Sequence, residues 1–149
     1  MNDAYDLRRF VDAQAPVYGQ VLLELRSGEK KSHWMWFVFP QLKGLGHSPV
    51  AQRYALSSSD EAAAYLDHPV LGPRLIECTG IVNGHEGRTA RGIFGHPDDL
   101  KFRSCMTLFA LTAPDSPVFK KALDKYFDGE TDPLTSRGLV SAKHGRLSG

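Results

Sequence analysis

The chain has 149 residues, of which 42% are hydrophobic and 23% are charged, and its formal net charge at pH 7 is +1. This composition is close to the globular average, which excludes an intrinsically disordered chain and a fibrous repeat. The balanced charge favours neither nucleic acid nor an anionic membrane as a partner. No apolar run approaches the roughly 20 residues that span a bilayer, and the first residues are charged. We therefore expect a cytoplasmic protein with no membrane or nucleic-acid partner.

Apolar residues recur with helical spacing from the start of the chain. Leu7 and Phe10 share one face of a first helix, for which Asp3 and Asp6 are the candidate N-caps. We expect this helix to end near Gln14, because a proline follows closely. Serine or threonine caps, prolines in the first turn and glycines after the last turn place the other helices. They are expected at 16–27, 48–54, 58–67, 71–83, 89–94, from 97, at 116–128 and from 132.

The stretch 32–41, SHWMWFVFPQ, is densely aromatic and holds both tryptophans of the chain. Residue propensity favours a buried β-strand here. We expect instead a short buried helix that ends at Pro40. The rest of the sequence offers no second strand, and a lone strand would leave its backbone groups without hydrogen bonds.

Trp34 and Trp36 have two interpretations. Large aromatic side chains in a small domain are more often core residues than binding residues. However, the polar residues His33 and Gln41 adjoin the tryptophans, and a polar rim beside aromatic rings suits a pocket that stacks a base or a sugar. These four residues are therefore candidate ligand-binding residues, and the choice between core and pocket stays open.

The sequence shows no internal repeat and no low-complexity segment. The expected fold class is all-α, as a single compact bundle of six to eight short helices. We expect one helical domain over 1–140. The segment 141–149 is expected to be a flexible C-terminal tail, because SAKHGRLSG has almost nothing to bury.

The helix that begins at Pro97 is apolar on most of its circumference, which is typical of a central, buried helix. The charges that it carries, at Asp98, Lys101 and Arg103, must therefore pair, cap the helix or face a cavity. For Arg103 two interpretations stay open. One is a buried ion pair with Asp12, Glu77 or another carboxylate, and the other is a role in binding an anion.

Cys78 and Cys105 lie in apolar helical segments without a CxxC pair, which predicts reduced, buried packing residues. The six histidines lack the HxxxH and HExxH spacings of metal ligands. The sequence also lacks the GxSxG motif of a serine nucleophile. We expect no metal site and no cofactor.

Four segments, DLRRFVDAQ, SHWMWFVFPQLKGLG, HPVLGPRL and DDLKFRSCMTLF, follow one another over nearly the whole chain. Together they resemble the signatures of domain-of-unknown-function family 1810, a bacterial all-helical family that genome annotation often labels "calpastatin". The resemblance implies a helical fold and a small cytosolic protein, but it brings no established activity. Calpain inhibitors of that name are extended, disordered repeats, so calpain inhibition is not expected of a chain with globular composition.

The chain is also similar, only in its helices and in its combination of tryptophan with acidic and basic residues, to helical domains proposed to act on ADP-ribose derivatives. This similarity implies that Trp34 or Trp36 stacks on a base. It implies that Lys101 and Arg103 hold phosphate oxygens.

The same similarity implies a catalytic carboxylate, Asp98 or Glu77, as the acid or base of N-glycoside cleavage. The functional prediction is an uncharacterised protein that binds or hydrolyses a small molecule, such as a nucleotide derivative of the ADP-ribose type. The alternative is a non-catalytic protein-interaction or structural module. Whether the protein is an enzyme, and its oligomeric state, stay open.

Overall fold

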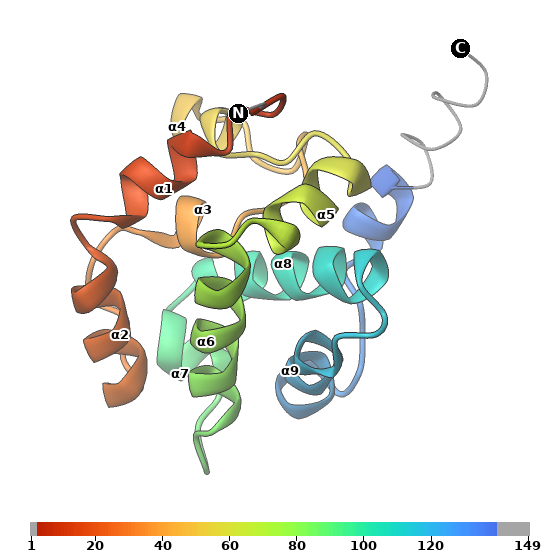
Figure 1. Cartoon of the computed structure of the whole chain (residues 1–149). Coiled ribbons are helices and arrows are strands. Elements are labelled where there is room, and N and C mark those ends of the chain that lie inside the picture. The colour runs from red at the N-terminus through yellow and green to blue at the C-terminus, as the bar shows by residue number, and fades with distance from the viewer. Residues whose placement is uncertain (1–2, 140–149) are drawn as a thin grey trace.

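The structure is a computed structural model that describes residues 3–139, and these residues form an all-α bundle (Figure 1). The helices, in chain order, are α1 (Arg8–Gln14), α2 (Tyr18–Ser27), α3 (Met35–Val38), α4 (Pro49–Arg53), α5 (Ser59–Asp67), α6 (Leu71–Asn83), α7 (Ala90–Phe94), α8 (Asp98–Thr112) and α9 (Pro117–Phe127). A last helical segment follows at 133–139.

The predicted all-α bundle of short helices is confirmed. Within the described residues the helices outnumber the expected six to eight, although α3, α4 and α7 each lie where the sequence predicted a short helix. No helix in this part of the chain combines the length and the apolar character needed to cross a membrane. The predicted tail at 141–149 lies outside the described residues.

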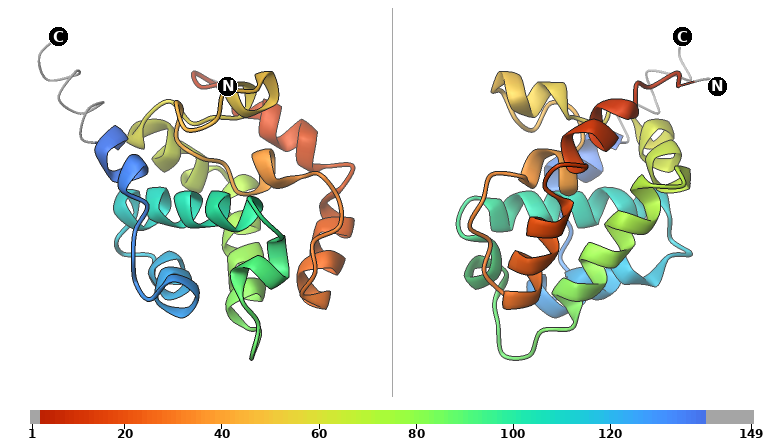
Figure 2. Two further views of the ribbon diagram at one scale, coloured as in Figure 1. Left: turned by 180° about the vertical axis from the view of Figure 1, so that it is seen from behind. Right: turned by 60° about the vertical axis from the view of Figure 1, so that its left-hand side comes forward.

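Helix α8 runs through the middle of the bundle, and α5, α7 and α9 pack against it (Figure 1; Figure 2). Its side chains Phe102, Cys105, Met106 and Phe109 are all fully buried. They point in several directions around the helix axis, since successive helical residues are about 100° apart. The prediction of a central, buried helix is therefore confirmed.

Side-chain caps begin several of the helices where the sequence predicted them. Ser48, Ser58 and Thr89 each accept a hydrogen bond from the backbone N–H three residues further on. The N-cap of α1 is Leu7 and not Asp3 or Asp6, although the Asp3 carboxylate accepts a hydrogen bond from the backbone N–H of Leu7 at 2.7 Å. Such caps satisfy N–H groups that have no partner inside the helix.

Arg9 ties α1 to the segment that joins α4 to α5. Its guanidinium donates to the carbonyl oxygens of Arg53 at 2.8 Å and Ala55 at 3.0 Å. It also pairs with the buried carboxylate of Glu61 at 3.0 Å. These contacts form one clamp, which we call the Arg9 clamp.

The aromatic stretch forms the four-residue helix α3, as predicted, and not a strand. Phe39, directly after it, is fully buried and meets the rings of Phe94 and Phe102 edge to face, with centroids 5.7 and 5.2 Å apart. Outside the helices, β-type pairing in the described part of the chain is limited to one isolated bridge between Leu42 and Leu56. Ring packing, rather than a sheet, therefore attaches this stretch to α7 and α8.

Candidate functional site

The two tryptophans have different surroundings although they are neighbours in sequence. Trp34 is 1% exposed, and its Nε1–H donates to the carboxylate of Glu24 at 3.0 Å. Trp36 is only partly buried. Trp34 is therefore a core residue, and Trp36 is the tryptophan whose ring a ligand can reach.

Glu24, on α2, is a buried carboxylate on which several donors converge. It accepts from the backbone N–H groups of Lys31 and Ser32 at 2.8 and 2.9 Å, and from the Ser32 hydroxyl at 2.6 Å. The Gln20 amide and the Trp34 indole also donate to it. Burial acts to raise the pKa of Glu24, but these hydrogen bonds outweigh it and lower the pKa to about 2.

A second polar group lies where the segment before α3 meets the first turn of α8. It consists of Lys30, Asp98, Lys101 and Trp36, and we call it the lysine–tryptophan cluster. Asp98 lies 2.9 Å from Lys30 Nζ through Oδ2 and 3.2 Å from Lys101 Nζ through Oδ1. Lys101 Nζ is 5.1 Å from the centre of the Trp36 ring, and Lys30 Nζ is 5.1 Å from that of Trp34. Each ammonium group thus lies over one tryptophan ring, and the two ammonium groups share the carboxylate of Asp98.

The charges of this cluster do not cancel, since two ammonium groups meet a single carboxylate. The side chain of Lys30 is 7% exposed, that of Asp98 19% and that of Lys101 28%. Partial burial strengthens the attraction of such charges for an anion, because water screens them less. The cluster can therefore hold an oxygen anion beside an aromatic ring, and Lys101 is its most accessible charge.

Arg103 does not belong to this cluster. It follows Lys101 by two residues, so about 200° of rotation separates the two side chains around α8. Its Nε and Nη2 donate to the carbonyl oxygens of Glu130 at 3.1 Å and Thr131 at 2.6 Å. Nη2 also lies 3.8 Å from the Glu130 carboxylate, so the ion pair considered for Arg103 forms with Glu130 rather than with Glu77. Arg103 fastens the segment after α9 to α8.

The other predicted residues lie at separate positions. Glu77 accepts a hydrogen bond from the Tyr18 hydroxyl between α2 and α6, and burial together with this bond raises the pKa of Tyr18. His33 is exposed, and Gln41 is partly buried with its carbonyl accepting from the backbone N–H of Leu56 at 2.9 Å. Among the interactions of the described residues, none joins these three side chains to the lysine–tryptophan cluster.

Sequence reasoning missed Glu24 and Lys30. Glu24 had a usable signal, because it falls on the apolar face of α2 beside Val21 and Leu25, and a charge there needs partners. Lys30 had none. Its partner Asp98 is far along the sequence, so only the folded chain brings the two together.

The cysteines are free and buried, as predicted for packing residues. Burial raises the pKa of the Cys78 thiol to about 12 and that of Cys105 well above its usual range. Both therefore stay protonated and are poor nucleophiles. Within residues 3–139, no group of three or more His, Cys, Asp or Glu side chains is arranged to hold a metal ion.

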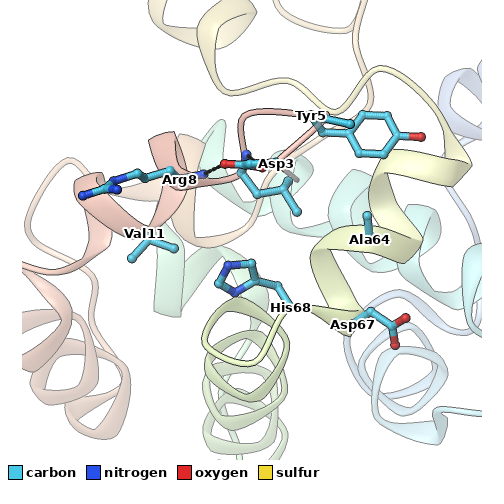
Figure 3. A pocket seen from close by; sticks show the side chains of 9 residues that line it. Asp3, Tyr5, Arg8, Val11, Ala64, Asp67 and His68 are labelled. Carbon is cyan, nitrogen blue, oxygen red and sulfur yellow. Dashed lines mark hydrogen bonds between the residues drawn. The ribbon is translucent and has the colours of Figure 1, made fainter. Parts of the chain in front are cut away.

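A cavity of about 670 Å³ lies between the N-terminal segment with α1 and the end of α5 (Figure 3). We call it the α1–α5 cavity. Leu7, Val11 and Ala64 contribute apolar lining, and Arg8 and His68 contribute polar lining. Its volume is in the range of about 300–1,000 Å³ that is usual for small-molecule sites. None of the candidate ligand-binding or catalytic residues predicted from sequence lines it.

Comparison with known proteins agrees with the resemblance found in the sequence. A family described as "Protein of unknown function (DUF1810)" matches residues 4–139. The crystal structure of the conserved hypothetical protein Rv1873 from Mycobacterium tuberculosis superposes with a TM-score of 0.92 at 57% sequence identity, covering 93% of this chain and 99% of that chain. A comparison with curated proteins gives no match. The chain belongs to this family of unknown function, DUF1810.

Proposed function

We propose that this protein binds a small anionic ligand with an aromatic ring, such as a nucleotide derivative of the ADP-ribose type, at the lysine–tryptophan cluster. One observation carries the proposal. Lys30 and Lys101 share a single carboxylate, Asp98, beside the partly exposed ring of Trp36. A phosphate or carboxylate group of the ligand would supply the negative charge that the cluster lacks.

Lys101 is the residue that we expect to move on binding. Its ammonium lies over the Trp36 ring and its side chain is the most exposed of the charged members. A lysine side chain is flexible, so Lys101 can turn from the ring to the ligand anion and leave the ring free to stack on a base. His33 and Gln41 are proposed as rim residues, because they flank the aromatic stretch in sequence.

The contacts support binding rather than catalysis. An acid or base for N-glycoside cleavage must be within reach of the substrate. Asp98 is in the cluster but is engaged by two ion pairs, and Glu77 is engaged by Tyr18. Arg103 is left out of the proposed site, because main-chain carbonyls take its hydrogen bonds.

Thermal unfolding with ADP-ribose, AMP or ribose 5-phosphate tests the proposal. A ligand at ten times its Kd stabilises the folded state by about 1.4 kcal/mol, which raises Tm by about 4 °C for a domain of this size. Lys101→Ala should remove the shift for all three compounds. Trp36→Leu should reduce it for ADP-ribose and AMP, which carry a base, but not for ribose 5-phosphate.

The matched control is Lys121→Ala, an exposed lysine on α9. This variant should respond to the ligands as the unmodified protein does. If Lys121→Ala and Lys101→Ala lose the shift equally, the attraction is a general charge effect and the proposed site is wrong. The absence of any shift up to 10 mM ligand would support the alternative, a non-catalytic interaction or structural module.

We also propose a cytoplasmic location and no nucleic-acid partner. The two free, buried cysteines support the first proposal, and the net charge of +1 supports the second. Calpain inhibition is not expected. An oligonucleotide that binds with the steep salt dependence of phosphate contacts would contradict the second proposal.

A further inference from the structure

The segment between α2 and α3 holds the main chain at Lys30 in a fixed position. Its backbone N–H donates to the carbonyl oxygen of Ile93 on α7 at 2.7 Å. The next two backbone N–H groups, of Lys31 and Ser32, both donate to the carboxylate of Glu24 on α2. The main chain at and after Lys30 is therefore attached to α7 and to α2.

The side chain of Lys30 is also held from several sides. Its Nζ donates to the carbonyl oxygen of Ser32 at 2.5 Å and lies 2.9 Å from Asp98 Oδ2. The ring of Trp34 lies beside the same ammonium group, and the indole N–H of this ring donates to Glu24. Only 7% of the Lys30 side chain is exposed, so it offers almost no surface to a ligand and acts mainly through its neighbours.

Lys101 is held more loosely by the other oxygen of Asp98. Its Nζ lies 3.2 Å from Oδ1, and 28% of its side chain is exposed. Because two positive charges divide one negative charge, the carboxylate neutralises neither ammonium group completely. Without Lys30, Asp98 would pair with Lys101 alone, and this pair would have no positive charge left for an anion.

We propose that Lys30 is a positioning residue of the anion site at Lys101. It occupies one oxygen of Asp98 and so keeps Lys101 available to a phosphate or carboxylate group that Lys30 itself does not contact. Glu24 supports this role from the core, because it holds the segment that carries Lys30. The inference rests on the function proposed for the lysine–tryptophan cluster.

Rescue by a second substitution tests the proposal, with ribose 5-phosphate as the probe and the NMR shift of the Lys101 amide as the signal. Lys30→Met should weaken binding by about tenfold, because the remaining pair of Asp98 and Lys101 is neutral. Adding Asp98→Asn to Lys30→Met leaves Lys101 as one uncompensated positive charge, as in the unmodified protein. The Kd of this double variant should return to within about threefold of the unmodified value. A residue that only supports the fold would not be rescued in this way.

Two further variants separate this role from other effects. Lys31→Met removes a positive charge from an exposed neighbour and should change the Kd by less than about twofold, because water and salt screen an exposed charge. Lys30→Gln keeps a hydrogen-bond donor for the Ser32 carbonyl but carries no charge, so it should bind as weakly as Lys30→Met. If Lys31→Met weakens binding as much as Lys30→Met, a general charge effect explains both losses and the proposal is wrong.

Acetylation by an N-hydroxysuccinimide ester, followed by mass spectrometry, tests the same role without a ligand. An ammonium group held by a carboxylate loses its proton less readily and reacts more slowly. The rate at Lys101, relative to that at the exposed Lys121, should therefore fall at least about twofold in Lys30→Met and recover in the double variant. This pattern without any response to ribose 5-phosphate would contradict the proposed binding function alone.

Three outcomes would overturn the role of Lys30. One is binding of ribose 5-phosphate that Lys30→Met leaves intact. Another is a loss of binding in Lys30→Met that Asp98→Asn does not restore. The third is an acetylation rate at Lys101 that is the same in Lys30→Met and in the unmodified protein.

Discussion

Trp34 and Trp36 are separated by one residue, yet the polar groups around them are used differently. At Trp34, five hydrogen bonds from four residues converge on the buried carboxylate of Glu24. At Trp36, the ammonium of Lys101 shares a carboxylate that Lys30 already uses. In the first region five hydrogen bonds satisfy the carboxylate, whereas in the second two ammonium groups share one carboxylate. A satisfied polar network stabilises a structure, and only an unsatisfied one has capacity left for a ligand.

The largest effect is expected from Glu24→Ala. This change leaves the Trp34 indole and two backbone N–H groups without their acceptor in a buried place, so the free energy of unfolding should fall by about 3–4 kcal/mol. Urea unfolding at pH 7 measures it. Glu29→Ala, at an exposed position near the end of the same helix, should change stability by less than about 0.5 kcal/mol. A similar loss in both variants would remove the contrast between the two regions.

The next largest effect is the pH dependence of stability that the Glu24 carboxylate causes. The pKa of Glu24 is lowered from 4.5 to about 2 in the folded protein, so the unfolded chain binds its proton more readily. Ionised Glu24 contributes at most about 3 kcal/mol to the free energy of unfolding. This contribution is complete above pH 4.5 and is lost as the pH falls toward 2. In Glu24→Gln, which cannot titrate, the fall in stability between pH 5 and pH 2.5 should be smaller than in the unmodified protein. Equal falls would show that other acids account for the acid sensitivity.

The smallest effect is expected from Trp36→Phe. Because Trp36 is only partly buried and donates no hydrogen bond given by the structure, stability should change by less than about 1 kcal/mol. The single tryptophan left in Trp36→Phe is the buried Trp34, and the one left in Trp34→Phe is Trp36. Acrylamide should quench the fluorescence of the second variant more strongly than that of the first. Equal quenching would mean that the two rings are equally accessible.

Much of the fold could be predicted from sequence because the signals that set it are local. Ser48, Ser58 and Thr89 each begin a helix where a capping residue precedes apolar periodicity. The helix in the aromatic stretch followed from a negative argument, since the sequence offered no second strand to pair with it. The apolar circumference of α8 predicted its central place.

The candidate site could be predicted only in part, because its contacts join residues far apart in the chain. Asp98, Lys101 and Trp36 were singled out by residue type, but the sequence could not show that Lys30 completes the group. It also could not show that the hydrogen bonds of Arg103 go to main-chain carbonyls. Every residue has a backbone carbonyl, so the residue types do not indicate which one accepts.

The Arg9 clamp has a consequence for how the chain reaches its fold. Its acceptors on Arg53, Ala55 and Glu61 lie 44, 46 and 52 residues further along the chain. The clamp therefore acts as a noncovalent crosslink that closes a loop containing α2, α3 and α4. Closing such a loop costs conformational entropy that the formation of a local helix does not. The hydrogen bonds and the ion pair of Arg9 must offset this cost in the folded protein.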